Sequence, residues 1–292
     1  MPTFDTPEPI SISVELGVGD LRISASDRTD TVVEVTPSDP AKKGDVTAAE
    51  QTRVEYENGR LVVRAPKGWR QWIPRGGTES IAVRIDVPAG SGFSGEADVA
   101  SLRCSGRLGG CRFKNGAGDI RIEEAASVEV RTGADDVTLD RVETAADVKT
   151  GSGTVRIGSV GGSVVVRNGN GGTWIGEVVG DARVSAANGE IKIDRALAGV
   201  SAKTANGGVR LGEVTRGAVV AQSAFGTIEV GVRDGVAAWL DLQTKFGNVQ
   251  NYLEAAERPG PEEDAVEVQA RTSFGDITIH RILAPAAGRE EA

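Results

Sequence analysis

The side chains of this sequence that could do chemistry are few and scattered. The 292 residues contain one histidine, His280, and two cysteines, Cys104 and Cys111. Acyl transfer by a nucleophile and a base usually needs a histidine, but His280 falls at the end of the last expected strand, where a surface residue is typical. The carboxylates alternate with basic residues along the turns, without the close pair that marks a glycosidase. We therefore expect no catalytic residues.

Neither a metal site nor a cofactor site is predicted. Six residues separate Cys104 from Cys111, which is not a usual zinc spacing. The segment GAGDIRI at 116–122 is faintly similar to a calcium-binding β-roll repeat, but the position after each glycine varies among Asp, Thr, Gly, Glu and Asn along the chain. The glycine-rich turns precede strands and not helices, which argues against a phosphate site. Both cysteines fall at inward positions, and a disulfide between them is the alternative to two buried thiols.

Basic side chains recur at fixed positions of a repeated segment, and they are candidates for a binding surface. Like charges repeated at strand spacing repel, so counter-charges or an anionic ligand should lie beside them. Pairing with acidic turn residues is one interpretation, and binding of an extended polyanion or acidic polysaccharide is the other. The first series holds Lys114, Arg131, Lys149 and Arg167, and the second holds Arg121, Arg156, Trp174, Lys192 and Arg210.

Tryptophan marks two further places where a partner could bind. Trp174 is expected to face outward among cations, where it would stack on them or bind a sugar. The segment APKGWRQWIPRGGTE, residues 65–79, combines residue types that are enriched at interface anchors and at membrane surfaces. The alternative is that its tryptophans plug the end of the fold. The candidates in this segment are Trp69, Arg70, Trp72 and Arg75.

A sequence repeat must position these side chains. Apolar residues lie two and four positions after each repeat marker, and again seven and five positions before it, which predicts two short strands per repeat. A strand pair of this kind buries little by itself and must stack on its neighbours, as Val166 and Val184 should. The markers are Ala100, Gly118, Asp135, Gly153, Gly171, Gly189, Gly207, Gly226, Gly247 and Gly275.

The pattern predicts an all-β protein, a parallel β-solenoid of about ten rungs with about 18 residues per rung. Residues 1–99 are expected to form an N-terminal β region that caps the solenoid, with half-buried strands at 31–35 and 80–87. Residues 100–281 hold the solenoid repeats, and residues 282–292 form a polar tail. The charged segment EAAERPGPEED at 254–264 is expected to be a loop between the last two rungs.

Several of these segments resemble a known family. GSGTVRIGSV, AANGEIKIDR and SFGDITIHR, together with GVGDLRISASDRTDTVVEV near the start, are similar to the bacterial β-strand-repeat family of unknown function labelled "putative adhesin". The similarity extends over nearly the whole chain. It implies a β-solenoid fold, and it implies no established activity and no catalytic residues.

Composition and charge narrow the expected role and location. A formal net charge of −9 makes nucleic acid or anionic lipid a poor partner. No uninterrupted apolar stretch reaches the length of a membrane span, and the start MPTFDTPEPISISV lacks a basic region and an apolar region. We therefore expect a soluble, cytoplasmic, non-catalytic scaffold or interaction protein with an unidentified protein partner. The alternative is a β-helix that binds a polyanion or polysaccharide or acts on a polysaccharide, and self-association stays open.

Overall fold

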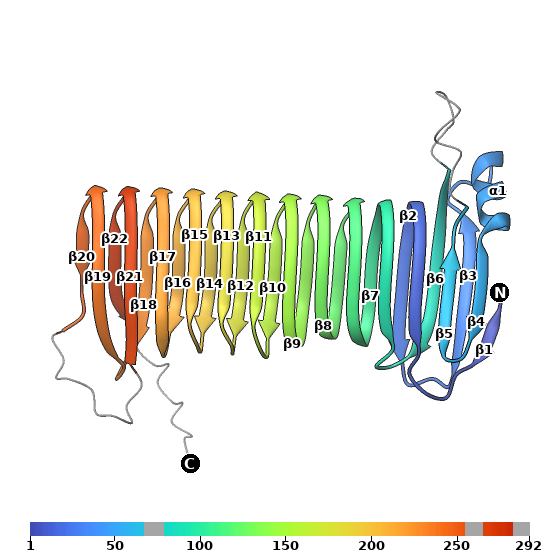
Figure 1. Ribbon diagram of the computed structural model, residues 1–292, viewed down its shortest axis with the longest axis horizontal. Helices are drawn as coiled ribbons and strands as arrows, with labels where there is room; N and C mark the ends of the chain where they lie inside the picture. The colour runs from blue at the N-terminus through green and yellow to red at the C-terminus, as the bar shows by residue number, and fades with distance from the viewer. Residues whose placement is uncertain (67–78, 255–264, 283–292) are drawn as a thin grey trace, which may run out of the picture. The chain divides into compact units, whose positions relative to one another are not determined.

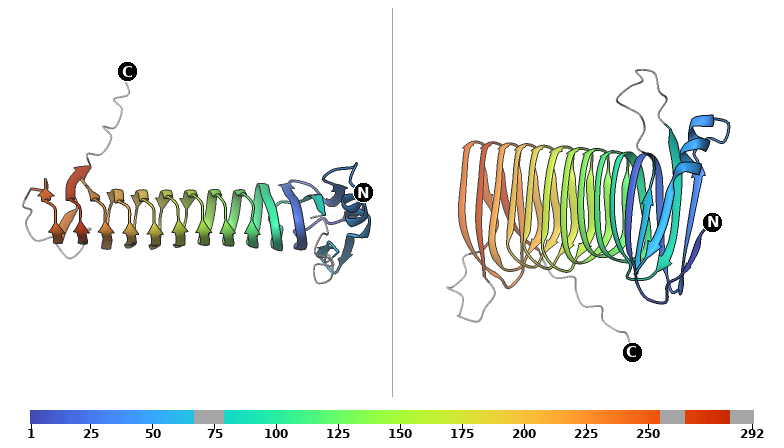
Figure 2. Two further views of the ribbon diagram at one scale, coloured as in Figure 1. Left: turned by 90° about the horizontal axis from the view of Figure 1, so that it is seen from above. Right: turned by 45° about the vertical axis from the view of Figure 1, so that its right-hand side comes forward.

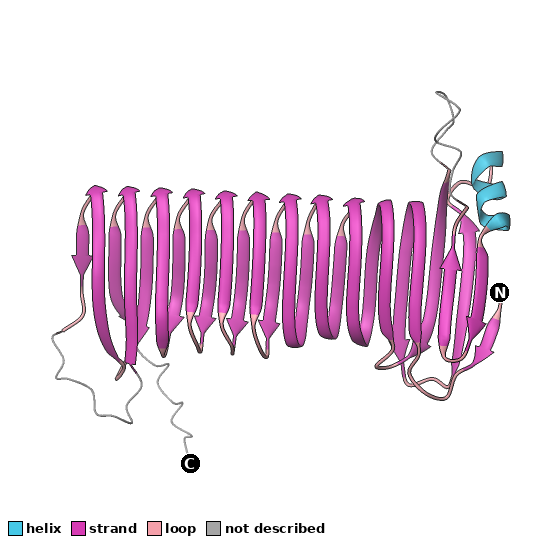
Figure 3. Ribbon diagram, viewed as in Figure 1, coloured by secondary structure: helices cyan, strands magenta, loops and turns pink. Residues whose placement is uncertain are grey.

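A computed structural model describes residues 1–66, 79–254 and 265–282. These residues form strands almost throughout, with one short helix in the described part of the chain (Figure 3). The chain divides into two compact units, Met1–Gly161 and Gly162–Ala292. Within each unit, strands stack coil upon coil (Figure 2). The all-β class is confirmed, whereas the number of rungs stays a prediction.

In the second unit, each coil contributes one strand to each of two parallel ladders. Val166 of one coil lies beside Val184 of the next, as the 18-residue repeat predicted, and both side chains are buried. The first ladder consists of β11 (Val164–Asn170), β13 (Ala182–Asn188), β15 (Val200–Asn206), β17 (Gly217–Phe225), β21 (Ala265–Phe274) and β19 (Ala237–Phe246). The second consists of β12 (Thr173–Val178), β14 (Ile191–Ala196), β16 (Val209–Val214), β18 (Ile228–Arg233), β22 (Ile277–Ile282) and β20 (Val249–Asn251).

The last two coils of the second unit do not follow sequence order. Val268 of β21 lies beside Val219 of β17 on one side and beside Leu240 of β19 on the other. β21, which follows β19 in the chain, is therefore inserted between β17 and β19 (Figure 1), an order that the sequence repeat did not predict. Val266, Val268 and Ala270 give β21 three fully buried apolar side chains, and Thr272 is the next inward residue.

Glycine and a buried hydroxyl hold the turns between the strands. Gly189 has φ +143°, and a Cβ there would lie 2.1 Å from the carbonyl oxygen of Gly171 in the coil before it. Only glycine fits such an approach. The hydroxyl of Thr204 donates to the carbonyl oxygens of Gly189 at 3.1 Å and Asn206 at 3.3 Å. The same bond recurs in later coils, from Ser223 to Gly207 and from Thr272 to Gly226.

The first unit contains a parallel stack of its own. Its strands pair in the order β2 (Ser11–Ser26), β7 (Gly92–Ala117), β8 (Ile120–Ala134), β9 (Val137–Ser152) and β10 (Val155–Val160). The expected boundary at residue 99 falls inside β7. β2, which belongs to the region expected to be a cap, pairs with β7 as a further coil would. Residue 99 therefore does not separate two structures within this unit.

The other edge of β2 is covered by more strands. β5 (Arg60–Arg64) and β6 (Ser80–Pro88) pair in parallel with its two halves. β4 (Arg53–Glu57), β3 (Asp30–Pro37) and β1 (Thr3–Asp5) then add antiparallel pairs. The strands expected at 31–35 and 80–87 lie in β3 and β6. This covering leaves no long open edge on β2 for another chain to pair with.

A short helix, α1 (Lys43–Gln51), was not predicted. Its nine residues include Gly44 and carry little apolar periodicity, so the local signal is weak. Tertiary contacts hold it, because the buried carboxylate of Asp45 accepts hydrogen bonds from the backbone N–H groups of Ser80 at 3.0 Å and Asp39 at 3.2 Å. No helix in the described residues has the length and apolar character needed to span a membrane.

Candidate functional site

One outward column of the first unit is made almost entirely of arginine. It takes one residue from each neighbouring strand, from β6 through β2, β7, β8 and β9 to β10, and every arginine in it is exposed. At about 4.8 Å between strands, the column is roughly 24 Å long. This arginine column consists of Arg84, Arg22, Arg103, Arg121, Thr138 and Arg156 in spatial order.

The alternation of the strands sets the direction of each arginine. Arg22 lies between Leu21 and Ile23, which are buried, so its own side chain must point outward. The same triplet of apolar residue, arginine and apolar residue occurs in each contributing strand except β9, as LRI, VRI, LRC, IRI and VRI. Of these arginines, the sequence repeat predicted only Arg121 and Arg156 as members of a basic series. The shared triplet was the signal for the other three, which lie in or beside the expected cap.

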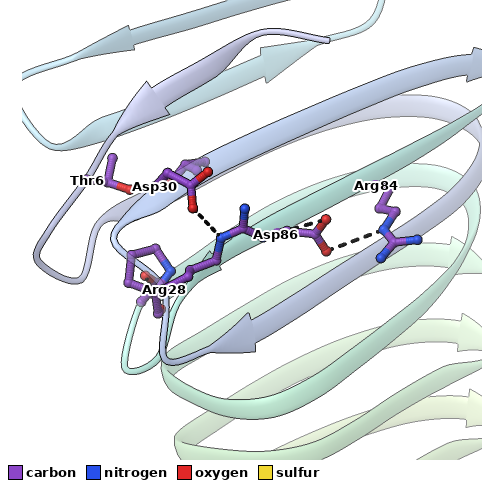
Figure 4. Close-up of polar contacts among 8 residues, drawn as sticks. Thr6, Arg28, Asp30, Arg84 and Asp86 are labelled. Atoms are coloured by element: carbon purple, nitrogen blue, oxygen red, sulfur yellow. Dashed lines mark hydrogen bonds and ion pairs between the residues drawn. The ribbon is translucent and has the colours of Figure 1, made fainter.

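The Arg84 end of the column is neutralised by neighbouring carboxylates. Arg84 Nε lies 3.3 Å from Asp86 Oδ1, and Arg28 Nη1 lies 3.7 Å from the other oxygen of Asp86. Arg28 Nε also donates a 2.9 Å hydrogen bond to Asp30 (Figure 4), and this bond lowers the pKa of the Asp30 carboxyl. Arg84 therefore contributes little uncompensated charge.

The middle of the column is different. Arg121 is paired with Asp140 at 3.2 Å, but neither Arg22 nor Arg103 has an ion pair with any residue that the structure describes. The nearest acidic residue in sequence to Arg22, Asp20, accepts a hydrogen bond from the hydroxyl of Ser101. These two adjacent arginines therefore lack a counter-charge among the described residues, and the repulsion between them favours a bound anion.

Two members of the other basic column have counter-charges. Lys114, Arg131 and Lys149 lie in register, as the repeat predicted. Lys114 Nζ lies 2.7 Å from Glu96 Oε1, and Arg131 Nη2 lies 2.9 Å from Glu129 Oε1. For these two residues the geometry fits the interpretation in which acidic neighbours neutralise the column.

The remaining predicted site residues lie in the second unit or outside the described residues. Arg167 lies beside Ser185 in the second unit. The indole N–H of Trp174 donates to Asp194 Oδ2 at 2.8 Å, and Lys192 Nζ lies 3.1 Å from the other oxygen of that carboxylate. The tryptophan is therefore tied to an ion pair in its own sheet. The residues of the 65–79 segment, Trp69, Arg70, Trp72 and Arg75, fall outside the described part of the chain.

The one histidine lies beside a carboxylate, and both cysteines are buried. His280 Nε2 lies 4.0 Å from Glu229 Oε1, and that carboxylate is also paired with Arg210 at 2.8 Å. Cys104 and Cys111 are buried free thiols. Burial raises the pKa of the Cys104 thiol well above its usual value and that of Cys111 to about 12, which disfavours the thiolate. Among the described residues, no group of three or more His, Cys, Asp or Glu side chains is placed to hold a metal.

Solved structures of similar extent share little sequence with this chain. One from Clostridium sporogenes, described as a putative cell adhesion protein, has 12% identity and a TM-score of 0.26 over 96% of this chain and 98% of that chain. One from Bacteroides fragilis, described as a putative adhesin, has 13% identity and a TM-score of 0.33 over 96% of both chains. One from Parabacteroides distasonis, described as a putative lipid binding protein, has 14% identity and a TM-score of 0.37 over 96% of this chain and 95% of that chain.

No function can be transferred from structures at these identities and TM-scores, and no curated protein matches the chain. A family model gives a broader result. The model described as Toastrack DUF4097 matches residues 9–281, which confirms the family resemblance of the repeated segments. This chain belongs to the Toastrack DUF4097 family.

Proposed function

We propose that this protein is a non-catalytic interaction scaffold. The observation that supports it is the parallel register, which sets outward side chains into straight columns at a fixed spacing. A partner with a repeating surface can meet such a column at several points at once. Some of the turn carboxylates are engaged in ion pairs, such as Asp140 with Arg121 and Glu177 with Arg195.

The arginine column favours a linear polyanion, such as an acidic polysaccharide, as the ligand. Guanidinium groups bind carboxylate, sulfate and phosphate through two parallel hydrogen bonds. Arg22 and Arg103 are exposed, adjacent and without a counter-ion among the described residues. An anion between them would remove their repulsion at little cost, because neither side chain has to leave an existing partner. An acidic protein surface is the alternative ligand.

Retention on immobilised heparin and on immobilised inorganic polyphosphate, measured over a range of salt concentrations, tests this proposal. The variant Arg22→Gln/Arg103→Gln should elute at lower salt and show a shallower salt dependence, because fewer counterions are released on binding. The control is Arg112→Gln/Arg131→Gln, which makes the same change in net charge at two arginines already paired with Glu129. Equal loss in both variants, or no loss in the first, would contradict binding at the arginine column.

We also propose a cytoplasmic location. The support is that Cys104 and Cys111 are free thiols, as in proteins of reducing compartments. Fractionation of cells that make the protein at its native level tests this. Recovery in the membrane fraction or outside the cell would contradict it.

A further inference from the structure

The second unit ends in a strand edge that nothing covers among the described residues. Among the strands that the structure describes, β19 pairs only with β21, and β20 pairs only with β22. β19 is ten residues long, contains no proline and pairs without a shift in register. Natural sheets usually protect such an edge with prolines, bulges or a covering segment. In the first unit, β5 and β6 cover the corresponding edge of β2.

The hydrophobic core reaches this edge. Val268 and Ala270 of β21 are fully buried. Leu240 and Leu242 of β19 occupy the matching inward positions beside them, yet both remain partly exposed. The end of the stack therefore presents both unpaired backbone groups and apolar core side chains to solvent.

Aromatic residues add to the apolar surface at this end. Trp239 is 56% exposed, and Phe246 and Tyr252 are each 64% exposed. Phe246 is the last ring of a stack in which its centroid lies 4.7 Å from that of Phe274, which in turn lies 4.9 Å from that of Phe225. The outer side of Phe246 has no further ring in the described residues. Exposed apolar surface of this extent marks an interaction site.

We propose that a second copy of this chain covers the edge, through antiparallel pairing of β19 with β19 of the copy about a twofold axis. Residues opposite each other in such a pair share a face of the sheet, so inward residues must meet inward residues. Pairing centred on Gln243 meets this condition, with Leu242 opposite Thr244 of the copy. It also places Asp241 of each chain opposite Lys245 of the other, which gives two such pairs. Pairing centred on Asp241 or on Lys245 would instead oppose like charges.

The charges of β19 are suited to this contact. Lys245 is exposed and has no ion pair with the described residues. Asp241 is exposed and accepts hydrogen bonds from Arg271 at 3.0 Å and Gln269 at 3.2 Å, and these bonds lower the pKa of its carboxyl. It thus stays ionised over a wide pH range and keeps further lone pairs for Lys245 of the copy.

Other occupants fit this edge less well. The segment AAERPGPEED at 255–264 contains Pro259 and Pro261, which lack the N–H needed to pair with a strand, and several acidic residues. A lipid surface would accept the aromatic rings but offers no directional partners for the backbone N–H and C=O groups of β19. A second copy supplies both, and a twofold axis normal to the sheet also brings β20 towards β20 of the copy.

Cross-linking with the full chain tests the proposed register. Gln243→Cys places two thiols across the twofold axis, close enough for a disulfide. Gln222→Cys is the matched control, because it lies in the same column but in β17, which has strands on both sides. Only the Gln243→Cys variant should become a disulfide-linked dimer on oxidation, and the parent should have twice the chain mass in light scattering. A monomeric parent at its highest soluble concentration, or equal cross-linking of both variants, would overturn the proposal.

Charge reversal tests the same contact without a new bond. Lys245→Glu would face Asp241 of the copy and should convert the dimer to a monomer with an unchanged circular dichroism spectrum. Lys203→Glu, the same charge change on the interior strand β15, should leave the dimer intact. A Lys245→Glu dimer as tight as the parent would refute the register. A monomeric parent that binds phosphatidylcholine vesicles, and loses this binding on Phe246→Ser, would assign the edge to lipid instead.

Discussion

Gly189→Ala is a direct test of how closely the coils approach each other. The glycine lies in a turn of the second unit with φ +143°, a conformation that L side chains rarely adopt. A Cβ added there would lie 2.1 Å from the carbonyl oxygen of Gly171 and 2.6 Å from its carbonyl carbon. Both atoms belong to the backbone, so no side chain can move aside to make room. The turn or the neighbouring coil must shift instead.

The expected loss of stability follows from these two effects. A non-glycine residue in a sparsely populated backbone region costs about 1–3 kcal/mol. Relief of the overlap requires the coils to separate locally, which weakens one or two backbone hydrogen bonds at about 1 kcal/mol each. Alanine restricts the unfolded chain and returns roughly 0.4–1 kcal/mol. The net destabilisation should therefore be about 1–5 kcal/mol.

Gly172→Ala is the matched control in the preceding coil. Its φ is not in the left-handed region, and the only neighbouring atom within 4 Å of the added Cβ would be the carbonyl oxygen of Glu190, at 4.0 Å. This variant should change the free energy of unfolding by no more than about 0.5 kcal/mol. Urea unfolding of both variants, followed by far-ultraviolet circular dichroism, gives the comparison. A Gly189→Ala midpoint equal to that of the control would show that the turn geometry described above is wrong.

Three further expectations follow from burial and charge. Val166→Asp should lower the free energy of unfolding by several kcal/mol, because Val166 is fully buried and the new carboxylate would have no partner. Val165→Asp, at the neighbouring outward position, should cost far less, and equal losses in urea unfolding would contradict the register. Folding raises the pKa of the Cys111 thiol to about 12, so the stability contributed by its buried neutral form is present below the unfolded pKa and is lost as pH rises towards the folded pKa. Rapid thiol labelling of the native protein at pH 8 would refute this. Arg271→Gln should raise the pKa of Asp241 towards its usual value in an NMR titration. In the parent, the stability contributed by this ion pair is present above the unfolded pKa and is lost as pH falls through the lowered folded pKa, and the variant should lack this contribution. An unchanged pKa would show that Arg271 does not cause the shift.

Much of the local structure could be predicted from the sequence because its signals lie within one repeat. Alternating apolar residues identify a strand with one buried face, and a glycine at a constant position identifies the turn. Together they predict that Val166 lies beside Val184 and Lys114 beside Arg131, and the register of the strands confirms both. The short helix α1 gave no such signal, because Asp45 is held by backbone groups of Asp39 and Ser80, the latter far away in the chain.

The candidate site was predicted only in part, because some of its arginines come together through strands that are far apart in the chain. Arg121 and Arg156 belong to recognisable repeats, whereas Arg84, Arg22 and Arg103 join them through pairing of β6, β2 and β7. Between β2 and β7 the chain forms α1 and the strands β3 to β6, and no local pattern shows which strands will meet across that distance.

The sequence by itself determined the period of the coil, the faces of its strands and the position of its turns, because each depends on residues a few positions apart. Only the tertiary structure decided which coils become neighbours. Coils with the same alternation of inward and outward residues can stack on one another in any order, so local sequence does not set the order of the coils. The order depends on contacts between segments far apart in the chain, and the structure places β21, with Val266, Val268 and Ala270 inward, between β17 and β19. This order leaves β19, with its partly exposed leucines, at the open end of the second unit among the described strands.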